Sequence, residues 1–170
     1  MPPLVLGPSS LPPMTSQPAR PPWDGDAWRH THLEGFDSFA TRSPFRAGLN
    51  ALREQNFARA ETVFARIARR LPKRDDAKAS FYLGATRMEL GKWEEAKADL
   101  EFAAQKSPAH PDPKSRLGVT YARLGDFAGA SAQRAELVKM AEACKGDCEL
   151  APYIADGMAM IDKALAEEAL

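Results

Sequence analysis

The stretch Ala79-Ser-Phe-Tyr-Leu-Gly-Ala-Thr-Arg-Met-Glu-Leu-Gly-Lys-Trp-Glu-Glu-Ala96 carries the signals of two helices joined by a tight turn. Apolar residues recur every three or four positions on both sides of Gly91, as expected for amphipathic helices. Gly91 permits the left-handed backbone that a short turn between two helices requires. The stretch therefore predicts a helical hairpin.

The hairpin pattern occurs three times. A shift of 34 residues places Leu83-Gly84 on Leu117-Gly118, and an earlier copy lies 36 residues before the quoted one. Small residues on both helices allow close approach, and an aromatic residue at the start of each second helix is predicted to fill the wedge between them. The recurring residues are Gly48, Gly84 and Gly118; Ala60, Ala96 and Ala130; and Phe57, Trp93 and Phe127. The first copy has Gln55-Asn56 where the turn glycine is expected.

Completed by Leu100, Ala103 and Pro108, the quoted stretch resembles the tetratricopeptide-repeat family. The resemblance covers about residues 44–142 and implies an all-α fold, a right-handed superhelical stack of antiparallel helix hairpins. We expect hairpins at about 43–74, 75–108 and 109–143, with Ser43-Pro44 and Asp112-Pro113 as helix starts. These hairpins and a Cys-containing turn make up residues 43–148. Residues 149–170 form a capping helix with an apolar stripe of Leu150, Ile154, Met158, Ile161 and Leu165.

Residues 1–42 are predicted to form an extended arm, because eight of them are proline, which removes backbone donors and fixes φ. The arm also carries four large aromatic residues, which have no core of their own. They are either incidental to a linker or dock on the repeats or on a partner. These aromatic residues are Trp23, Trp28, Phe36 and Phe39.

Cys144 and Cys148 are the only cysteines and allow three interpretations. Gly146 breaks the helix between them, so a disulfide across the turn is possible in an oxidising compartment. They are otherwise two free thiols of a cytosolic protein, or a redox pair, although redox pairs usually have two intervening residues. The disulfide interpretation favours an extracytoplasmic location such as a bacterial periplasm, while residues 1–20 do not resemble a signal peptide.

No catalytic or cofactor motif is present in the sequence. His30 and His32 lack a third metal ligand nearby, and no glycine-rich phosphate loop precedes a strand. The formal net charge is zero, which does not favour a nucleic-acid partner, and no apolar run is long enough for a membrane span. The basic residues Arg66, Arg69, Arg70, Lys73 and Arg74 are interpreted as solvated charges near a helix end.

The family resemblance implies a concave groove lined by the first helix of each hairpin, which usually holds a segment of a partner protein. We expect at least a third of the groove positions to pack between repeats instead. The positions are Phe45, Leu49, Leu52 and Arg53 in the first copy; Lys78, Phe81, Ala85, Met88 and Glu89 in the second; and Asp112, Ser115, Val119, Ala122 and Arg123 in the third.

Some members of this family hold the C-terminal carboxylate of chaperones with a clamp of Lys, Asn and Arg side chains. Here the corresponding positions hold Phe45, Leu49 and Ser115, which disfavours that partner. We therefore expect a non-catalytic adaptor or accessory subunit without a cofactor, which binds a protein segment through an apolar groove, its arm, or both. The alternatives are a thiol-redox protein that uses Cys144 and Cys148, and a purely structural subunit of a large assembly.

Overall fold

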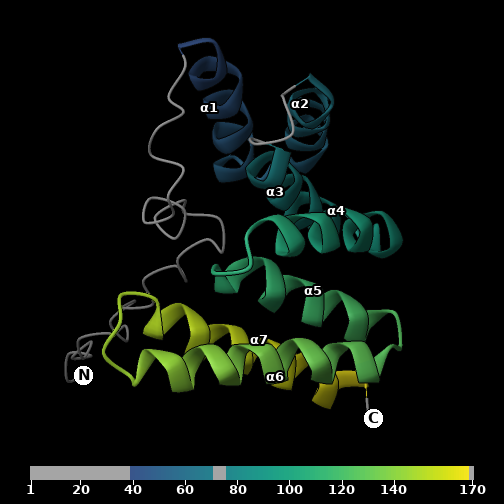
Figure 1. The fold of residues 1–170 in the computed structure, drawn as a ribbon. Coiled ribbons are helices and arrows are strands. Elements are labelled where there is room, and N and C mark those ends of the chain that lie inside the picture. The colour runs from purple at the N-terminus through teal and green to yellow at the C-terminus, as the bar shows by residue number, and fades with distance from the viewer. Residues whose placement is uncertain (1–38, 71–75, 169–170) are drawn as a thin grey trace, which may run out of the picture.

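The computed structural model describes residues 39–70 and 76–168, with side chains described for residues 44–69 and 77–168. These residues form seven α-helices and no strand. The helices are α1 (Phe39–Arg53), α2 (Phe57–Arg70), α3 (Asp76–Glu89), α4 (Trp93–Lys106), α5 (Pro111–Arg123), α6 (Phe127–Cys144) and α7 (Ala151–Glu168). Figure 1 shows three successive antiparallel hairpins, α1–α2, α3–α4 and α5–α6, with α7 alongside α6.

Each helix packs mainly against its neighbours in the sequence, and α7 packs against both α5 and α6. Two hydrophobic clusters result: one extends from α1 to the middle of α5, and the second joins α5, α6 and α7. Val119 and Tyr121 of α5 contact both clusters and so connect them. The architecture is the predicted solenoid of antiparallel helix hairpins, in which contacts are made between neighbouring units.

The repeated glycines of the first helices are sites of close helix approach, as predicted. A Cβ atom added to Gly48 would lie 2.6 Å from Phe64 Cζ, and one added to Gly84 would lie 2.7 Å from Leu100 Cγ. At Gly118 the added atom would lie 2.4 Å from Cδ1 of Ile161, which belongs to α7. The same small-residue position therefore brings the second helix close in two hairpins and the capping helix close in the third.

The structure corrects two predicted helix starts. Helix α1 begins at Phe39, so Ser43 is not its N-cap and Pro44 lies inside the helix. Because proline has no N–H, Pro44 cannot donate the hydrogen bond expected four residues back. Helix α5 begins at Pro111, and its N-cap is His110, whose Nδ1 accepts a hydrogen bond from the Asp112 backbone N–H at 3.3 Å.

The prediction of wedge-filling aromatic residues holds for two of the three copies. Phe57 and Trp93 are partly buried and pack against the first cluster, whereas Phe127 is 48% exposed. Helix α7 matches its predicted stripe: Ile154 and Ile161 are buried, and Leu150, Met158 and Leu165 pack against them.

The turns between paired helices share one backbone feature. Gly91 and Gly125 have φ values of +70° and +78°, and Gln55 takes the same role in the first hairpin at φ +55°. A left-handed backbone costs a residue with a Cβ atom about 1 kcal/mol or more, and this cost does not apply to glycine. The first hairpin thus folds with a strained turn residue.

We predict that Gln55→Gly raises the free energy of unfolding by about 0.5–1 kcal/mol, because Gln55 is exposed and only its backbone strain is removed. Gly91→Ala is the matched control. This substitution should lower the free energy of unfolding by about 1 kcal/mol. The whole effect comes from the positive φ of residue 91, since no atom lies within 4 Å of the added Cβ. Urea unfolding followed by circular dichroism measures the free energy of unfolding of both variants. A destabilised Gln55→Gly variant would contradict the assignment of backbone strain to Gln55.

Candidate functional site

The predicted groove positions divide into two groups in the structure. Apart from Asp112 and Ala122, seven of the twelve groove positions are half-buried or exposed: Phe45, Leu49, Arg53, Lys78, Glu89, Val119 and Arg123. The other five are buried: Leu52, Phe81, Ala85, Met88 and Ser115. The surface that the first helices offer to a partner is therefore narrower than the repeat register alone implies.

The five buried positions are core positions and do not line a groove, in line with the expectation that at least a third of the groove positions pack between repeats. Leu52, Phe81 and Met88 belong to the first hydrophobic cluster, and Ala85 is fully buried within α3. Ser115 is covered by the capping helix, since a Cβ atom added to Gly157 of α7 would lie only 2.0 Å from Ser115 Oγ. Of the two other positions of the third copy, Ala122 is also buried, whereas Asp112 is half-buried. Packing between the helices accounts for the burial of these side chains.

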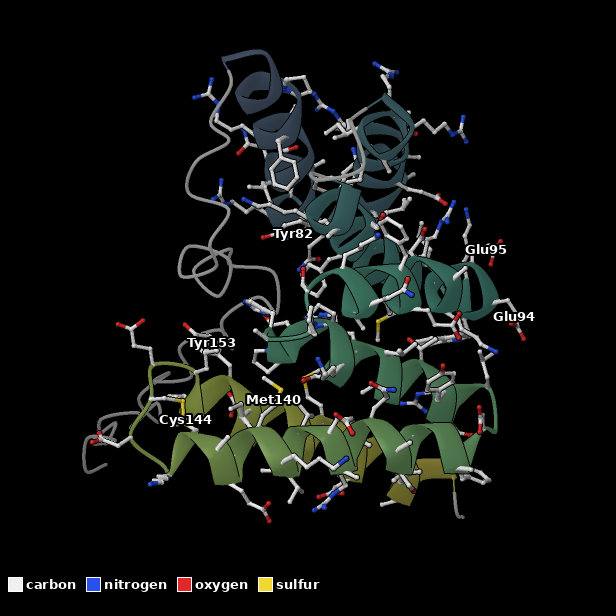
Figure 2. All side chains as sticks on the ribbon, in the orientation of Figure 1. Tyr82, Glu94, Glu95, Met140, Cys144 and Tyr153 are labelled. Atoms are coloured by element: carbon white, nitrogen blue, oxygen red, sulfur yellow. A yellow bond between two sulfur atoms is a disulfide. The ribbon has the colours of Figure 1, made fainter. Side chains whose placement is uncertain are left out.

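An aromatic cluster joins the first two hairpins. The ring of Tyr82 lies 5.3 Å from Phe45 of α1, 5.3 Å from Phe64 of α2 and 5.2 Å from Phe81, measured between ring centroids. The contact with Phe64 is stacked and those with Phe45 and Phe81 are edge-on, which are the arrangements that aromatic quadrupoles favour. Figure 2 shows Tyr82 on α3, beside α1. Phe45 is the partly accessible member of this cluster.

Two cations lie over the rings of this cluster. Lys78 Nζ is 4.9 Å from the centroid of Phe45, and the guanidinium carbon of Arg116 is 5.9 Å from that of Phe81. Both distances are within the range of cation–π attraction. Helices α1, α3 and α5 thus bring rings and positive charges together, with Phe45 and Lys78 half-buried and the other three side chains buried. We call the residues Phe45, Lys78, Phe81, Tyr82 and Arg116 the aromatic–cation cluster.

Arg116 is a functional candidate that sequence reasoning missed. It is only 5% exposed, and burial lowers its pKa, although Asp112, Glu89 and Tyr82 favour the charged form. A buried guanidinium is costly, so such residues are often retained for a specific contact. The repeat register could have indicated this residue. A shift of 34 residues places Arg116 on Tyr82, which is the centre of the aromatic cluster.

Arg123, a predicted groove residue, contacts the capping helix. Its guanidinium pairs with Glu168 at 2.7 Å and also with Glu167, both near the end of α7. The hydrogen bond to Glu168 is the largest of the influences that raise the Arg123 pKa. The role observed for Arg123 is to fasten α7 to α5.

An ion-pair network joins the first and second hairpins on the outer side. Arg87 Nε lies 3.2 Å from Glu61 and Arg87 Nη1 lies 2.7 Å from Asp99, while Lys92 Nζ lies 2.8 Å from Glu61. The hydrogen bond from Lys92 is the largest influence on Glu61 and lowers its pKa. For Asp99 burial outweighs the attraction of Arg87 and raises the pKa to about 6.

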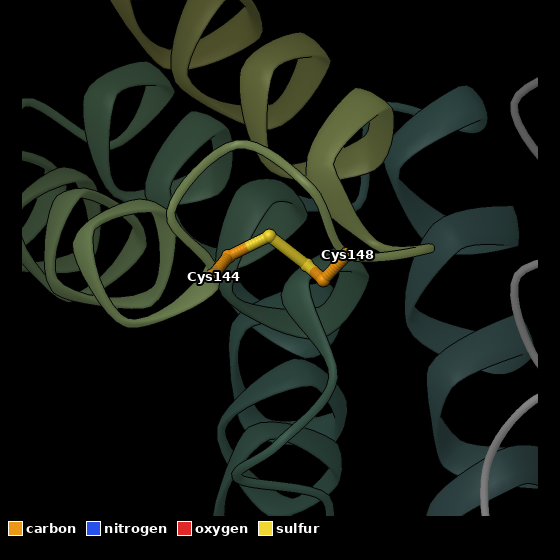
Figure 3. The surroundings of a disulfide bond; sticks show 2 residues. All are labelled: Cys144 and Cys148. Atoms are coloured by element: carbon orange, nitrogen blue, oxygen red, sulfur yellow. A yellow bond between two sulfur atoms is a disulfide. The ribbon is translucent and has the colours of Figure 1, made fainter.

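Cys144 and Cys148 form a disulfide in this structure, and their Cα atoms are 5.3 Å apart. Figure 3 shows the bond at the turn between the end of α6 and the start of α7. Lys145, with φ +54°, and Gly146, with φ +77°, reverse the chain between the two cysteines. The predicted break of the helix at Gly146 brings the sulfur atoms together.

The described part of the chain contains no metal-binding constellation, since no three His, Cys, Asp or Glu side chains there are grouped for a metal ion. None of the helices that the structure describes is both long enough and apolar enough to cross a membrane. Of the arm residues, Trp23, Trp28 and Phe36 lie outside the described residues. Phe39 is the first residue of α1, but its side chain is not among those described.

The sequence profile of the tetratricopeptide repeat matches residues 87–142, which include the end of α3, all of α4 and α5, and most of α6. Residues 87–142 thus match the tetratricopeptide-repeat family, and the other described helices continue the same arrangement of hairpins. The three hairpins and the capping helix together form the repeat stack that the resemblance implied. No curated protein matches it in sequence.

Two solved structures share the fold of this chain. One is PcrH in complex with the chaperone binding region of PopD, with a TM-score of 0.65 and 21% identity over 80% of this chain and 98% of PcrH. The other is the TPR2B domain of yeast Sti1 in a complex with pHsp70, with a TM-score of 0.61 and 20% identity over 74% of this chain and 98% of that domain. At these identities the likeness establishes the fold alone.

The raised pKa of Asp99 predicts a pH dependence of stability. Between pH ~4 and pH ~6 the native state binds a proton at Asp99 more tightly than the unfolded chain does. The stabilisation is therefore fully present below pH ~4 and is lost as the pH rises through about 6. Relative to Asp99→Asn, the wild-type protein should lose about 1–2 kcal/mol of unfolding free energy over this window.

Urea unfolding of the wild type and Asp99→Asn at a series of pH values measures this difference. Glu94→Gln is the control, because Glu94 is an exposed carboxylate on the same helix (Figure 2). It should show no comparable trend. A difference between wild type and Asp99→Asn that stays constant with pH would contradict the prediction.

Proposed function

We propose that this protein is a non-catalytic adaptor or accessory subunit that binds a segment of a partner protein along its first helices. The observation that carries the proposal is the half-buried part of the aromatic–cation cluster, in which Phe45 packs on the buried Tyr82 and has Lys78 Nζ 4.9 Å from its ring centroid. Phe45, Leu49 and Val119 add apolar side chains that are only partly buried. Such a surface suits a helical or extended segment that carries apolar and aromatic side chains.

The structural relatives support this class of function, since both were solved with a bound partner: PcrH with a region of PopD, and the Sti1 domain with pHsp70. The chemistry of this surface differs from a carboxylate clamp. Phe45 and Leu49 are apolar, and Ser115 is buried beneath α7. We therefore propose recognition of side chains along a segment rather than capture of a C-terminal carboxylate.

The arm is the proposed occupant of this surface when the partner is absent. The last four residues of the predicted arm, 39–42, belong to α1, and residues 23–38 combine three large aromatic residues with an acidic excess of Asp24, Asp26, Glu34 and Asp37 over Arg29. That composition complements the half-buried ring of Phe45 with Lys78 beside it. A segment attached to its own binding surface has a high effective concentration, so modest contacts suffice.

The disulfide supports an oxidising compartment, of which the bacterial periplasm is the one we propose. A redox role is not favoured, because Cys144 ends α6 and a helix C-terminus disfavours a thiolate. Thiol labelling of the denatured, unreduced protein from its native source tests the location. We expect no free thiol, and labelling of both cysteines would contradict an oxidising compartment.

We predict that Val119→Glu weakens partner capture by about tenfold or more, equivalent to ~1.4 kcal/mol, because it places a charge on the inner apolar surface. The measurement is affinity capture with the intact protein followed by quantitative mass spectrometry. Val63→Glu is the matched control, since Val63 is also half-buried but lies on the outer helix α2. Phe81→Glu is unsuitable, because Phe81 is buried in the core.

The same capture tests the arm. A chain that begins at Phe39 should either melt at a lower temperature, because the inner surface loses its cover, or lose the captured complex. An unchanged melting temperature together with unchanged capture would refute the role of the arm. Equal loss in Val119→Glu and Val63→Glu, by contrast, would refute recognition by the inner surface.

A further inference from the structure

A cavity lies between α2 and α3, and none of its lining residues belongs to the aromatic–cation cluster. Its volume is about 510 Å³, within the range of ligand sites. Five lining residues come from α2 and recur on one face of that helix, and Arg87 of α3 completes the wall. The lining residues are Glu61, Thr62, Ala65, Arg66, Arg69 and Arg87.

The charges that line this cavity are not balanced. Arg87 is held by Glu61 and Asp99, and Glu61 also pairs with Lys92, so these four groups neutralise one another. Arg66 and Arg69 are exposed, and neither has a carboxylate partner among the side chains that the structure describes. The cavity thus carries an excess of two positive charges supplied by guanidinium groups, which bind carboxylates in a two-pronged geometry.

The shape of the lining favours a peptide over a small anion. The eight-residue separation of Glu61 and Arg69 along α2 corresponds to about 12 Å, the length of three to four extended residues. Arg66 and Arg69 are three positions apart, so their Cβ atoms are about 5–6 Å apart. Alternate side chains of an extended strand lie ~6.6 Å apart on one face, which matches this spacing.

The hydrogen-bond acceptors that line the cavity also favour a peptide ligand. The Thr62 hydroxyl donates to the Ala58 carbonyl at 3.0 Å, which leaves its oxygen able to accept a hydrogen bond. The Glu61 carboxylate is a second acceptor. A peptide brings backbone N–H donors for it as well as carboxylates for the arginines, whereas a phosphate dianion has no N–H donor. The cavity offers both kinds of partner that an acidic peptide needs.

We propose that this cavity binds an extended acidic segment of a protein partner, in which two carboxylates two residues apart pair with Arg66 and Arg69. The site is independent of the inner surface formed by α1, α3 and α5. If both surfaces engage one partner, each raises the effective concentration at the other.

The test uses the full-length protein and a labelled peptide, acetyl-Gly-Glu-Gly-Glu-Gly-amide, with binding followed by fluorescence anisotropy. Arg66→Gln/Arg69→Gln should weaken binding by about tenfold, and the analogue with Gln in place of both Glu should not bind measurably. Raising the ionic strength from about 0.01 M to 0.15 M should weaken the wild-type complex, because the Debye length falls from ~30 Å to ~8 Å.

The matched control is Arg46→Gln/Arg59→Gln, which removes two exposed arginines that do not line the cavity. It should bind the peptide within about twofold of wild type. An equal loss in this control would overturn the site in favour of non-specific charge attraction. Inorganic phosphate that displaces the peptide at equal concentration would overturn the peptide assignment.

The chain's own Asp24-Gly25-Asp26 has the proposed spacing of carboxylates and is a rival occupant. In the full-length protein, Asp24→Asn/Asp26→Asn should therefore leave the affinity for the peptide unchanged. Tighter binding by that variant would overturn the assignment to a partner and place the chain's own segment in the cavity.

Discussion

The stack depends on the absence of a side chain at a few helix-crossing positions. At Gly48, Gly84 and Gly118 an added methyl group would come within 3.0 Å of a side chain on the neighbouring helix, so that side chain would have to shift in a close-packed core. The close approach at these glycines allows Phe64, Leu100 and Ile161 to fill the space between helices, and all three are fully buried. The apolar area that these contacts bury is the main source of stability in such folds.

Close packing at the glycines also determines which surfaces remain for binding. Because α7 is drawn against Gly118, it covers Ser115 and pairs with Arg123, so the third hairpin contributes less to the inner surface than the first two. The first hairpin leaves Phe45 partly accessible, next to the stacked rings of Phe64 and Tyr82. The candidate binding surface is therefore concentrated around α1 and α3.

Periodicity predicted the helices, the small-residue contacts and the capping stripe, because each depends on local spacing. The burial of several groove positions was harder to predict. The repeat register assigns Leu52, Phe81 and Met88 to the inner face of the first helices, but it does not show how closely neighbouring helices cover that face. The N-cap at His110 was missed because histidine is rarely a cap, and Asp112 carries the usual signal. The cavity near Arg66 is formed by helices of two hairpins. The sequence of α2 alone suggested only solvated charges and could not predict it.

The disulfide has a consequence for how the protein withstands cleavage. Lys145 is exposed in the turn between α6 and α7, where a trypsin-like protease would find an accessible basic residue. A cut there falls between Cys144 and Cys148, so the two fragments stay covalently joined and α7 remains seated on α5. Only reduction of the bond would then release the final helix and uncover the apolar contacts of Leu137 and Ile161.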